Sequence, residues 1–186
     1  MNETLKTIAN RYSCRAFKDT TPSDDQLSAI ANAAIQSPSA RNQQRWHIVV
    51  VKNKALISEL ETEAMRVISE MEDKSWLERI KARGGKLFYD APCIIFVPIK
   101  PEELVSAALD CGIVCQTIAL AATSVGLASC IHGLSGLAFA KDKAKYFKEK
   151  LSFPDGYEFG ASVLIGEPAK EFAPHVPNPE KITFIE

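Results

Sequence analysis

The segment from Leu104 to Leu127 places the strongest limit on how this chain can fold. Its apolar spacing predicts a helix over residues 103–124 that is apolar on most faces, so most of its surface has to be buried. Asp110 and Gln116, with several Ser and Thr residues, argue against a membrane span. In so short a chain, we expect part of this helix to pack against a second subunit.

The length and charge of the chain narrow its class. A chain of 186 residues suits one domain, which we predict to span residues 1–186. Charged residues make up 24% and the net charge is -1, which gives no support for nucleic acid or a membrane surface as a partner. No signal-like apolar run opens the chain, and five scattered cysteines without a C-x-x-C pair suit a reducing compartment. We therefore expect a cytoplasmic protein without disulfides.

Periodicity and turn residues predict the order of the elements. Helices are expected over residues 2–10, from Ser23 to before Pro38, over 54–72, over 73–90 with an end at Gly84–Gly85, and over 140–150. Strands or extended segments are expected over residues 46–52, 93–98, 125–133 and 157–166, with a candidate edge strand at 182–185. The Pro-rich tail after Glu167 is expected to lie on a partner subunit.

The segment Arg11-Tyr-Ser-Cys-Arg-Ala-Phe17 carries a candidate anion clamp. If it is extended, Arg11, Ser13 and Arg15 project from the same side, because side chains alternate along a strand. Two guanidinium groups beside a hydroxyl suit a phosphate, since arginine pairs with phosphate oxygens in a bidentate way. The alternative is a solvated basic face.

The segment Ser37-Pro-Ser-Ala-Arg-Asn-Gln-Gln-Arg-Trp-His47 joins a helix to a buried strand. Its small and amide side chains can grip a flat polar heterocycle without presenting a nucleophile. The alternative is a plain turn in which Trp46 only fills the core.

Motifs for protein-borne catalysis are missing from the sequence. His47, His132 and His175 lack metal-ligand spacing, and no H-E-x-x-H, G-x-S-x-G, P-loop or G-x-G-x-x-G pattern occurs. A thiol nucleophile at Cys14 or Cys130 stays open as a weaker reading. If the protein is an enzyme, we expect a cofactor to carry the reaction and no catalytic side chain or metal.

Four motifs in order give the chain a family resemblance. They are the segments 11–17 and 37–47 quoted above, Gln116-Thr-Ile-Ala-Leu-Ala-Ala-Thr-Ser-Val-Gly-Leu127, and Leu164-Ile-Gly-Glu-Pro168. Together they resemble the FMN-dependent nitroreductase family. The resemblance implies an α+β fold with a central mixed β-sheet flanked by helices, in an intertwined homodimer with FMN at the subunit interface.

The resemblance also implies roles for the segment 11–15. Arg11 and Ser13, with Tyr12 between them, would hold the FMN phosphate. Arg15 would reach the phosphate and ribityl side or the pyrimidine end of the flavin. A guanidinium at the pyrimidine end would favour the reduced flavin, because reduction puts negative charge there.

The resemblance assigns the flavin ring to two further segments. Pro38, Ser39 and Ala40 would come from the opposite subunit to line the ring, and Asn42 and Gln43 would continue that polar wall. The second segment would lie along the ring and offer a backbone N–H to the flavin N5; its residues are Cys130, Ile131, His132 and Gly133. Lys170 or His175 would replace the basic residues that the family's C-terminal segment sends to the phosphate.

The resulting hypothesis is an oxidoreductase that takes a hydride from NADH or NADPH and passes it to a nitroaromatic, a quinone or a similar planar acceptor. Hydride transfer needs a ring face held close to its partner and no acid–base residue. The alternative from another class is a flavin-binding protein for storage or sensing, without turnover.

Overall fold

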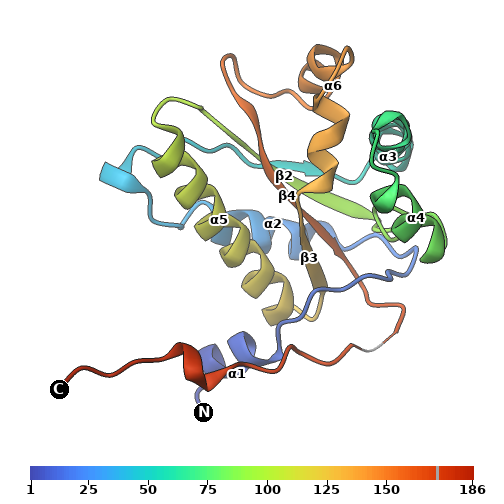
Figure 1. Cartoon of the computed structure of the whole chain (residues 1–186). Helices are drawn as coiled ribbons and strands as arrows, with labels where there is room; N and C mark the ends of the chain where they lie inside the picture. The colour runs from blue at the N-terminus through green and yellow to red at the C-terminus, as the bar shows by residue number, and fades with distance from the viewer. Residues whose placement is uncertain (171) are drawn as a thin grey trace.

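A four-stranded sheet forms the centre of the computed structural model, which describes residues 1–170 and 172–186 (Figure 1). The strand order is β1-β2-β4-β3, with β1 at Val49–Val51, β2 at Cys93–Ile99, β4 at Glu158–Gly166 and β3 at Ala128–His132. All three strand pairings are antiparallel. A mixed sheet was expected, and its parallel component is limited to one isolated parallel bridge between Ser13 and Ser129. The predicted α+β class is confirmed.

Helices cover both faces of this sheet (Figure 1). On one face lie α2 (Asp24–Ala34) and α5 (Leu104–Ser124); on the other lie α3 (Lys54–Glu70), α4 (Ser75–Ala82), η2 (Leu134–Phe139) and α6 (Ala144–Lys150). Side chains of β2 alternate between two cores: Ile94 and Phe96 join the α3 side, and Ile95 and Val97 join the α5 side. Because both faces are covered, β2 is apolar throughout and does not alternate with polar residues.

Local sequence signals fix several helix boundaries. Ser23 accepts a hydrogen bond from the Gln26 N–H, and the Gln26 side chain accepts one from the Ser23 N–H, so a capping box begins α2 at the predicted start of the helix. Asn53 caps α3 by accepting from the Leu56 N–H. The short helices α1 (Glu3–Asn10) and η3 (Pro179–Lys181) lie near the two ends of the chain.

The strand predicted over residues 46–52 is shorter than expected. Only Val49–Val51 form β1, and Trp46 makes an isolated bridge to Ile99. Pro98 stands opposite His47 and has no N–H to donate to the ladder. The ladder is therefore interrupted beside His47, although the His47 N–H still donates to the Pro98 carbonyl oxygen at 2.9 Å.

Two other boundaries are corrections. The helix predicted over residues 140–150 begins at Ala144, after the 3-10 helix η2. The candidate edge strand at 182–185 is wrong, because these residues pair with no strand in the described part of the chain. The sheet edges are β1 and β3, and Figure 1 shows the tail passing below α1 and leaving the body of the molecule.

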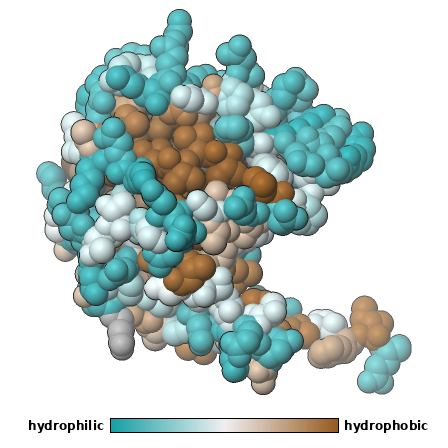
Figure 2. All heavy atoms as spheres, turned by 180° about the vertical axis from the view of Figure 1, so that it is seen from behind, coloured by the Kyte–Doolittle hydropathy of each residue, from teal (hydrophilic) through white to brown (hydrophobic). Residues whose placement is uncertain are grey.

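Helix α5 has two different sides. Within residues 1–170 and 172–186, it is the one helix whose length and composition would suit a membrane span. Its inner side chains, such as Val114 and Ile118, are buried against α2 and the sheet, as in a core helix. On its outer side, Val105 is 86% exposed and Leu109 is 66% exposed. Figure 2 shows a broad apolar patch on one face of the molecule and further apolar side chains on the extended tail.

Candidate functional site

The segment that follows α1 lies along the outer edge of β3. The Cys14 N–H donates to the Ser129 carbonyl oxygen at 2.8 Å, and the Phe17 N–H donates to the Tyr89 carbonyl oxygen at 3.1 Å. On its other side, the Ala169 N–H donates to the Ala16 carbonyl oxygen at 2.9 Å. These bonds hold residues 13–17 between β3 and the chain that leaves β4. Cys14 points into the core, so Ser13 and Arg15 face the other way, as the alternation predicted.

Three cations near this segment have no carboxylate partner. Among residues 1–170 and 172–186, Arg11, Arg15 and Lys170 form no ion pair. Burial raises the pKa of the Cys14 thiol, and the charges of Arg15 and Lys170 oppose that rise. The pKa of Cys130 is also raised by burial, against the charges of Arg15 and Arg11. Three uncompensated positive charges at one sheet edge suit a multiply charged anion such as phosphate.

The thiols themselves are poorly suited to nucleophilic chemistry. Cys14 and Cys130 are buried, and burial raises the pKa of each, so both stay protonated near neutral pH. All five cysteines are free. Within the described part of the chain, no three His, Cys, Asp or Glu side chains are grouped to hold a metal ion. This site therefore favours ligand binding over thiol catalysis.

The end of β3 turns outward beside the clamp. Ile131 is 44% exposed and Gly133 is exposed, whereas the His132 side chain is buried. The His132 Nδ1 atom lies 3.1 Å from the Ser135 hydroxyl, which lies 2.6 Å from the Ser162 hydroxyl. Both hydroxyls also lie 3.0 Å from the His132 carbonyl oxygen. This buried network fixes the turn, so that its backbone and Ile131 are presented at the surface.

The environment of His132 keeps its imidazole neutral. Burial and then the charge of Arg83 lower its pKa to about 4, although the nearby Leu87 carbonyl opposes the shift. The Nε2 atom has no hydrogen-bond partner of normal geometry among the residues that the structure describes. Rings of Phe88 and Tyr89 stand edge-on to the imidazole, with centroids 5.5 and 6.0 Å away.

This buried imidazole predicts a loss of stability in mild acid. Between pH 6.5 and about 4 the unfolded chain binds a proton at His132 that the folded chain does not, so stability falls as the pH falls through that window. From pH 7 to pH 5 we expect a loss of about 2 kcal/mol per chain. Urea unfolding at the two pH values measures it. The variant His132→Asn should lose most of this dependence, and an unchanged dependence would contradict the assignment.

Two residues beside this turn were not expected from the sequence. Arg83 donates to the Tyr89 hydroxyl at 3.2 Å, and its guanidinium lies 5.5 Å from the centroid of the Tyr89 ring. Tyr89 and Asp90 both have positive φ, at 56° and 60°, which is unusual for residues other than glycine. Such backbone strain concentrates at functional sites.

The loop that contains Pro38, Ser39, Ala40, Asn42 and Gln43 is anchored on α5. The buried Asp110 carboxylate accepts from the Ala40 N–H at 3.1 and 3.2 Å. The Ser37 hydroxyl donates to Thr117 Oγ1 at 2.9 Å, and Ser39 Oγ accepts from the Gln44 N–H at 2.9 Å. Asp110 interrupts an apolar helix because it holds this loop, a role that sequence reasoning missed.

A single chain does not bring the two groups of predicted residues together. The loop 38–43 leads into β1. The clamp at residues 11–15 runs alongside β3, which is the opposite edge of the sheet. Figure 1 shows η1 (Ala40–Asn42) and the segment after α1 in separate parts of the molecule. Lys170 lies near the clamp. His175 is exposed in the tail and has no hydrogen bond or ion pair with the residues described.

Known proteins resemble this chain over most or all of its length. A family model described as "Nitroreductase family" matches residues 8–167. A solved structure of a nitroreductase with bound FMN from Desulfitobacterium hafniense DCB-2 is 56% identical, with a TM-score of 0.98 and full coverage of both chains. A nitroreductase with bound FMN from Bacteroides fragilis NCTC 9343 is 26% identical, with a TM-score of 0.89 and full coverage of both. A protein of Archaeoglobus fulgidus with the provisional name NADH dehydrogenase/NAD(P)H nitroreductase is 27% identical over 92% of this chain and 88% of its own length.

Proposed function

The chain belongs to the nitroreductase family, and from this premise we propose that it is an FMN-dependent oxidoreductase. It takes a hydride from NADH or NADPH and passes it to a nitroaromatic, a quinone or a similar planar acceptor. The names of relatives that bind FMN or use NAD(P)H support this choice. We further propose one FMN-binding domain over residues 1–186 and, from its free thiols, a cytoplasmic location.

One observation carries the proposal: near the edge of β3 lie three positive charges that have no carboxylate partner among residues 1–170 and 172–186. A phosphate monoester such as that of FMN carries close to two negative charges and fits this donor set. In our assignment, Arg11 and Ser13 bind the phosphate, Arg15 reaches the phosphate side or the pyrimidine end, and Lys170 adds charge. Lys170 is preferred to His175 because its charge lowers the pKa of Cys14, which lies between Ser13 and Arg15, so Lys170 is close to the clamp.

When bound, FMN supplies the hydride and electron transfer. The turn Ile131–Gly133 offers a backbone N–H to the ring, and the His132–Ser135–Ser162 network keeps that donor oriented. The loop 38–43 supplies small and amide side chains that hold the ring and exclude water. None of these roles needs an acid–base side chain.

The proposed assembly is a homodimer with FMN at the subunit interface. The loop 38–43 and the clamp lie at opposite sheet edges, so a second subunit is needed to bring such residues together. The exposed apolar side of α5 and the apolar tail, where Phe184 is 87% exposed, support an interface there. We propose that both surfaces pack on the partner.

Rapid reduction by a pyridine nucleotide is the result expected of the enzyme. Under anaerobic conditions, NADH or NADPH should bleach the yellow FMN-loaded protein, and a quinone or nitroaromatic should restore the colour. Stopped-flow absorbance measures both steps. A yellow protein that neither nucleotide bleaches would favour the alternative of flavin storage or sensing, and a chain that cannot be loaded with FMN would contradict both readings.

A further inference from the structure

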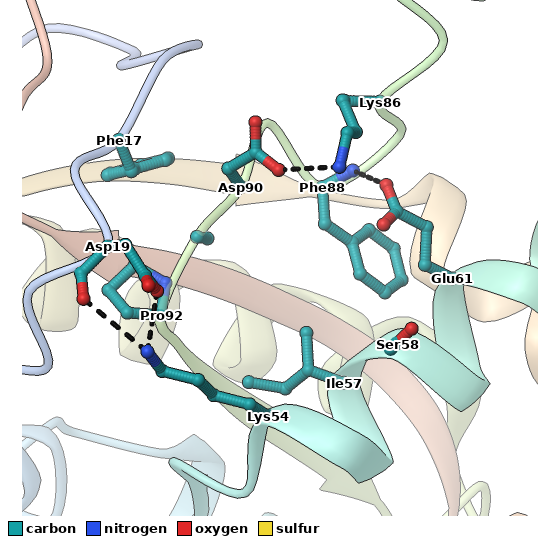
Figure 3. Close-up of a pocket in the computed structure, with 11 residues that line it drawn as sticks. Phe17, Asp19, Lys54, Ile57, Ser58, Glu61, Lys86, Phe88, Asp90 and Pro92 are labelled. Carbon is teal, nitrogen blue, oxygen red and sulfur yellow. Dashed lines mark hydrogen bonds and ion pairs between the residues drawn. The ribbon is translucent and has the colours of Figure 1, made fainter.

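A separate pocket of about 470 Å³ opens on the α3 side of the molecule (Figure 3). It lies between the first half of α3, residues 17–19 and residues 86–92. None of the residues assigned to the FMN clamp lines it. Whatever it binds is therefore distinct from the proposed flavin phosphate.

Apolar side chains form the floor of this pocket. Phe17, Ile57 and Phe88 are all buried and belong to the core on this side of the sheet. Pro92 also lines the pocket (Figure 3). Such a surface suits an aromatic or aliphatic group, because its contact removes apolar area from water.

Two lysines at the rim are already neutralised. The Lys54 Nζ atom lies 2.6 Å from Asp19 Oδ1, and the Lys86 Nζ atom lies 2.9 Å from Asp90 Oδ1. Figure 3 shows each lysine turned toward its own carboxylate. The hydrogen bond that Lys86 donates to the Asp90 carboxylate raises the pKa of Lys86, so this ammonium stays charged at neutral pH. Neither lysine is available to an incoming anion without breaking its pair.

Glu61 is the rim carboxylate that lacks such a partner. It accepts from the Phe88 N–H at 2.8 Å and, within the described residues, forms no ion pair. Lys86 is near enough for Glu61 to raise its pKa, but it is bonded to Asp90. Three carboxylates and two lysines therefore line the pocket, which leaves a net charge of -1.

We propose that this pocket binds a small amphipathic cation, with its ammonium group at Glu61 and its apolar body on Phe17, Ile57 and Phe88. A partly buried carboxylate without a cation is stabilised by such a ligand. A metal ion is disfavoured because the described residues include no cluster of three metal-ligating side chains. An anion is disfavoured by the paired lysines.

The probe for this site is 2-phenylethylammonium, which joins one ammonium to one aromatic ring. We expect saturable binding to the FMN-loaded protein with a Kd on the order of 1 mM, measured by ligand-observed NMR. The uncharged isostere 2-phenylethanol should bind at least about tenfold more weakly, because it cannot pair with Glu61. The flavin should stay bound throughout the titration.

The variant Glu61→Gln tests the charge while preserving the fold. Its amide oxygen can still accept from the Phe88 N–H, but the negative charge is gone, so binding should weaken about tenfold. Glu78→Gln, on the exposed face of α4 outside the pocket, is the matched control and should bind like wild type. Absence of saturable binding, equal binding of the alcohol, or equal binding by Glu61→Gln would each overturn the proposal. If the probe displaces FMN, the assignment to a separate site is also overturned.

Discussion

Replacing Arg11 by Ala is expected to weaken FMN binding by about 2–5 kcal/mol, or roughly 30-fold to 4,000-fold. Arg11 follows α1 and is partly buried beside β3, where no carboxylate in the described residues neutralises it. If the phosphate of FMN is its partner, the variant loses a partly desolvated charge pair. The fold should survive, because the guanidinium makes no hydrogen bond within the described chain.

Riboflavin separates the phosphate from the ring in this experiment. Fluorescence titration of the flavin-free protein should show that Arg11→Ala loses affinity for FMN but keeps the wild-type affinity for riboflavin, which lacks the phosphate. Arg79→Ala is the matched control, because Arg79 is exposed on α4 and its guanidinium lies over the exposed Trp76 ring. An equal loss for both flavins would place Arg11 at the ring, and an unchanged FMN affinity would remove it from the clamp.

The sequence predicted most of the secondary structure because these signals are local. The cap at Ser23, the apolar run of β2 and the spacing of α5 each lie within one segment. The errors lie where a residue distant in the sequence determines whether a segment forms a strand. Residues 46–48 stay outside β1 because Pro98, on the neighbouring strand β2, has no N–H to donate to the ladder. The tail at 182–185 has strand-like composition, but composition does not supply an edge to pair with.

The site was predictable only in part for the same reason. Arg11, Ser13 and Arg15 occur within five residues, so their common side could be read from alternation. Asp110 holds Ala40 across 70 residues, and only the fold brings them together. The positive φ of Tyr89 could not be predicted from the sequence, because tyrosine rarely adopts a positive φ.

Replacing Leu109 by Glu is expected to separate the proposed dimer into monomers. Leu109 is 66% exposed on the outer side of α5, so a single folded chain tolerates the charge. In a two-fold interface the change places two carboxylates in apolar surroundings, and each costs several kcal/mol without a cation. The dimer dissociation constant should rise by more than about 1,000-fold. Analytical ultracentrifugation over a concentration series measures it.

Loss of the dimer should also remove the flavin, which links assembly to function. If the loop 38–43 of one subunit completes the site of the other, Leu109→Glu should retain less than about a tenth of the wild-type FMN at micromolar concentrations, even though Leu109 is not assigned to the cofactor. Trp76→Glu puts the same charge on an exposed apolar residue of α4 and should leave both the dimer and the FMN content unchanged. A monomeric Leu109→Glu protein with full FMN would show that one chain forms the site alone. A Leu109→Glu protein that is still dimeric would show that the interface does not lie on α5.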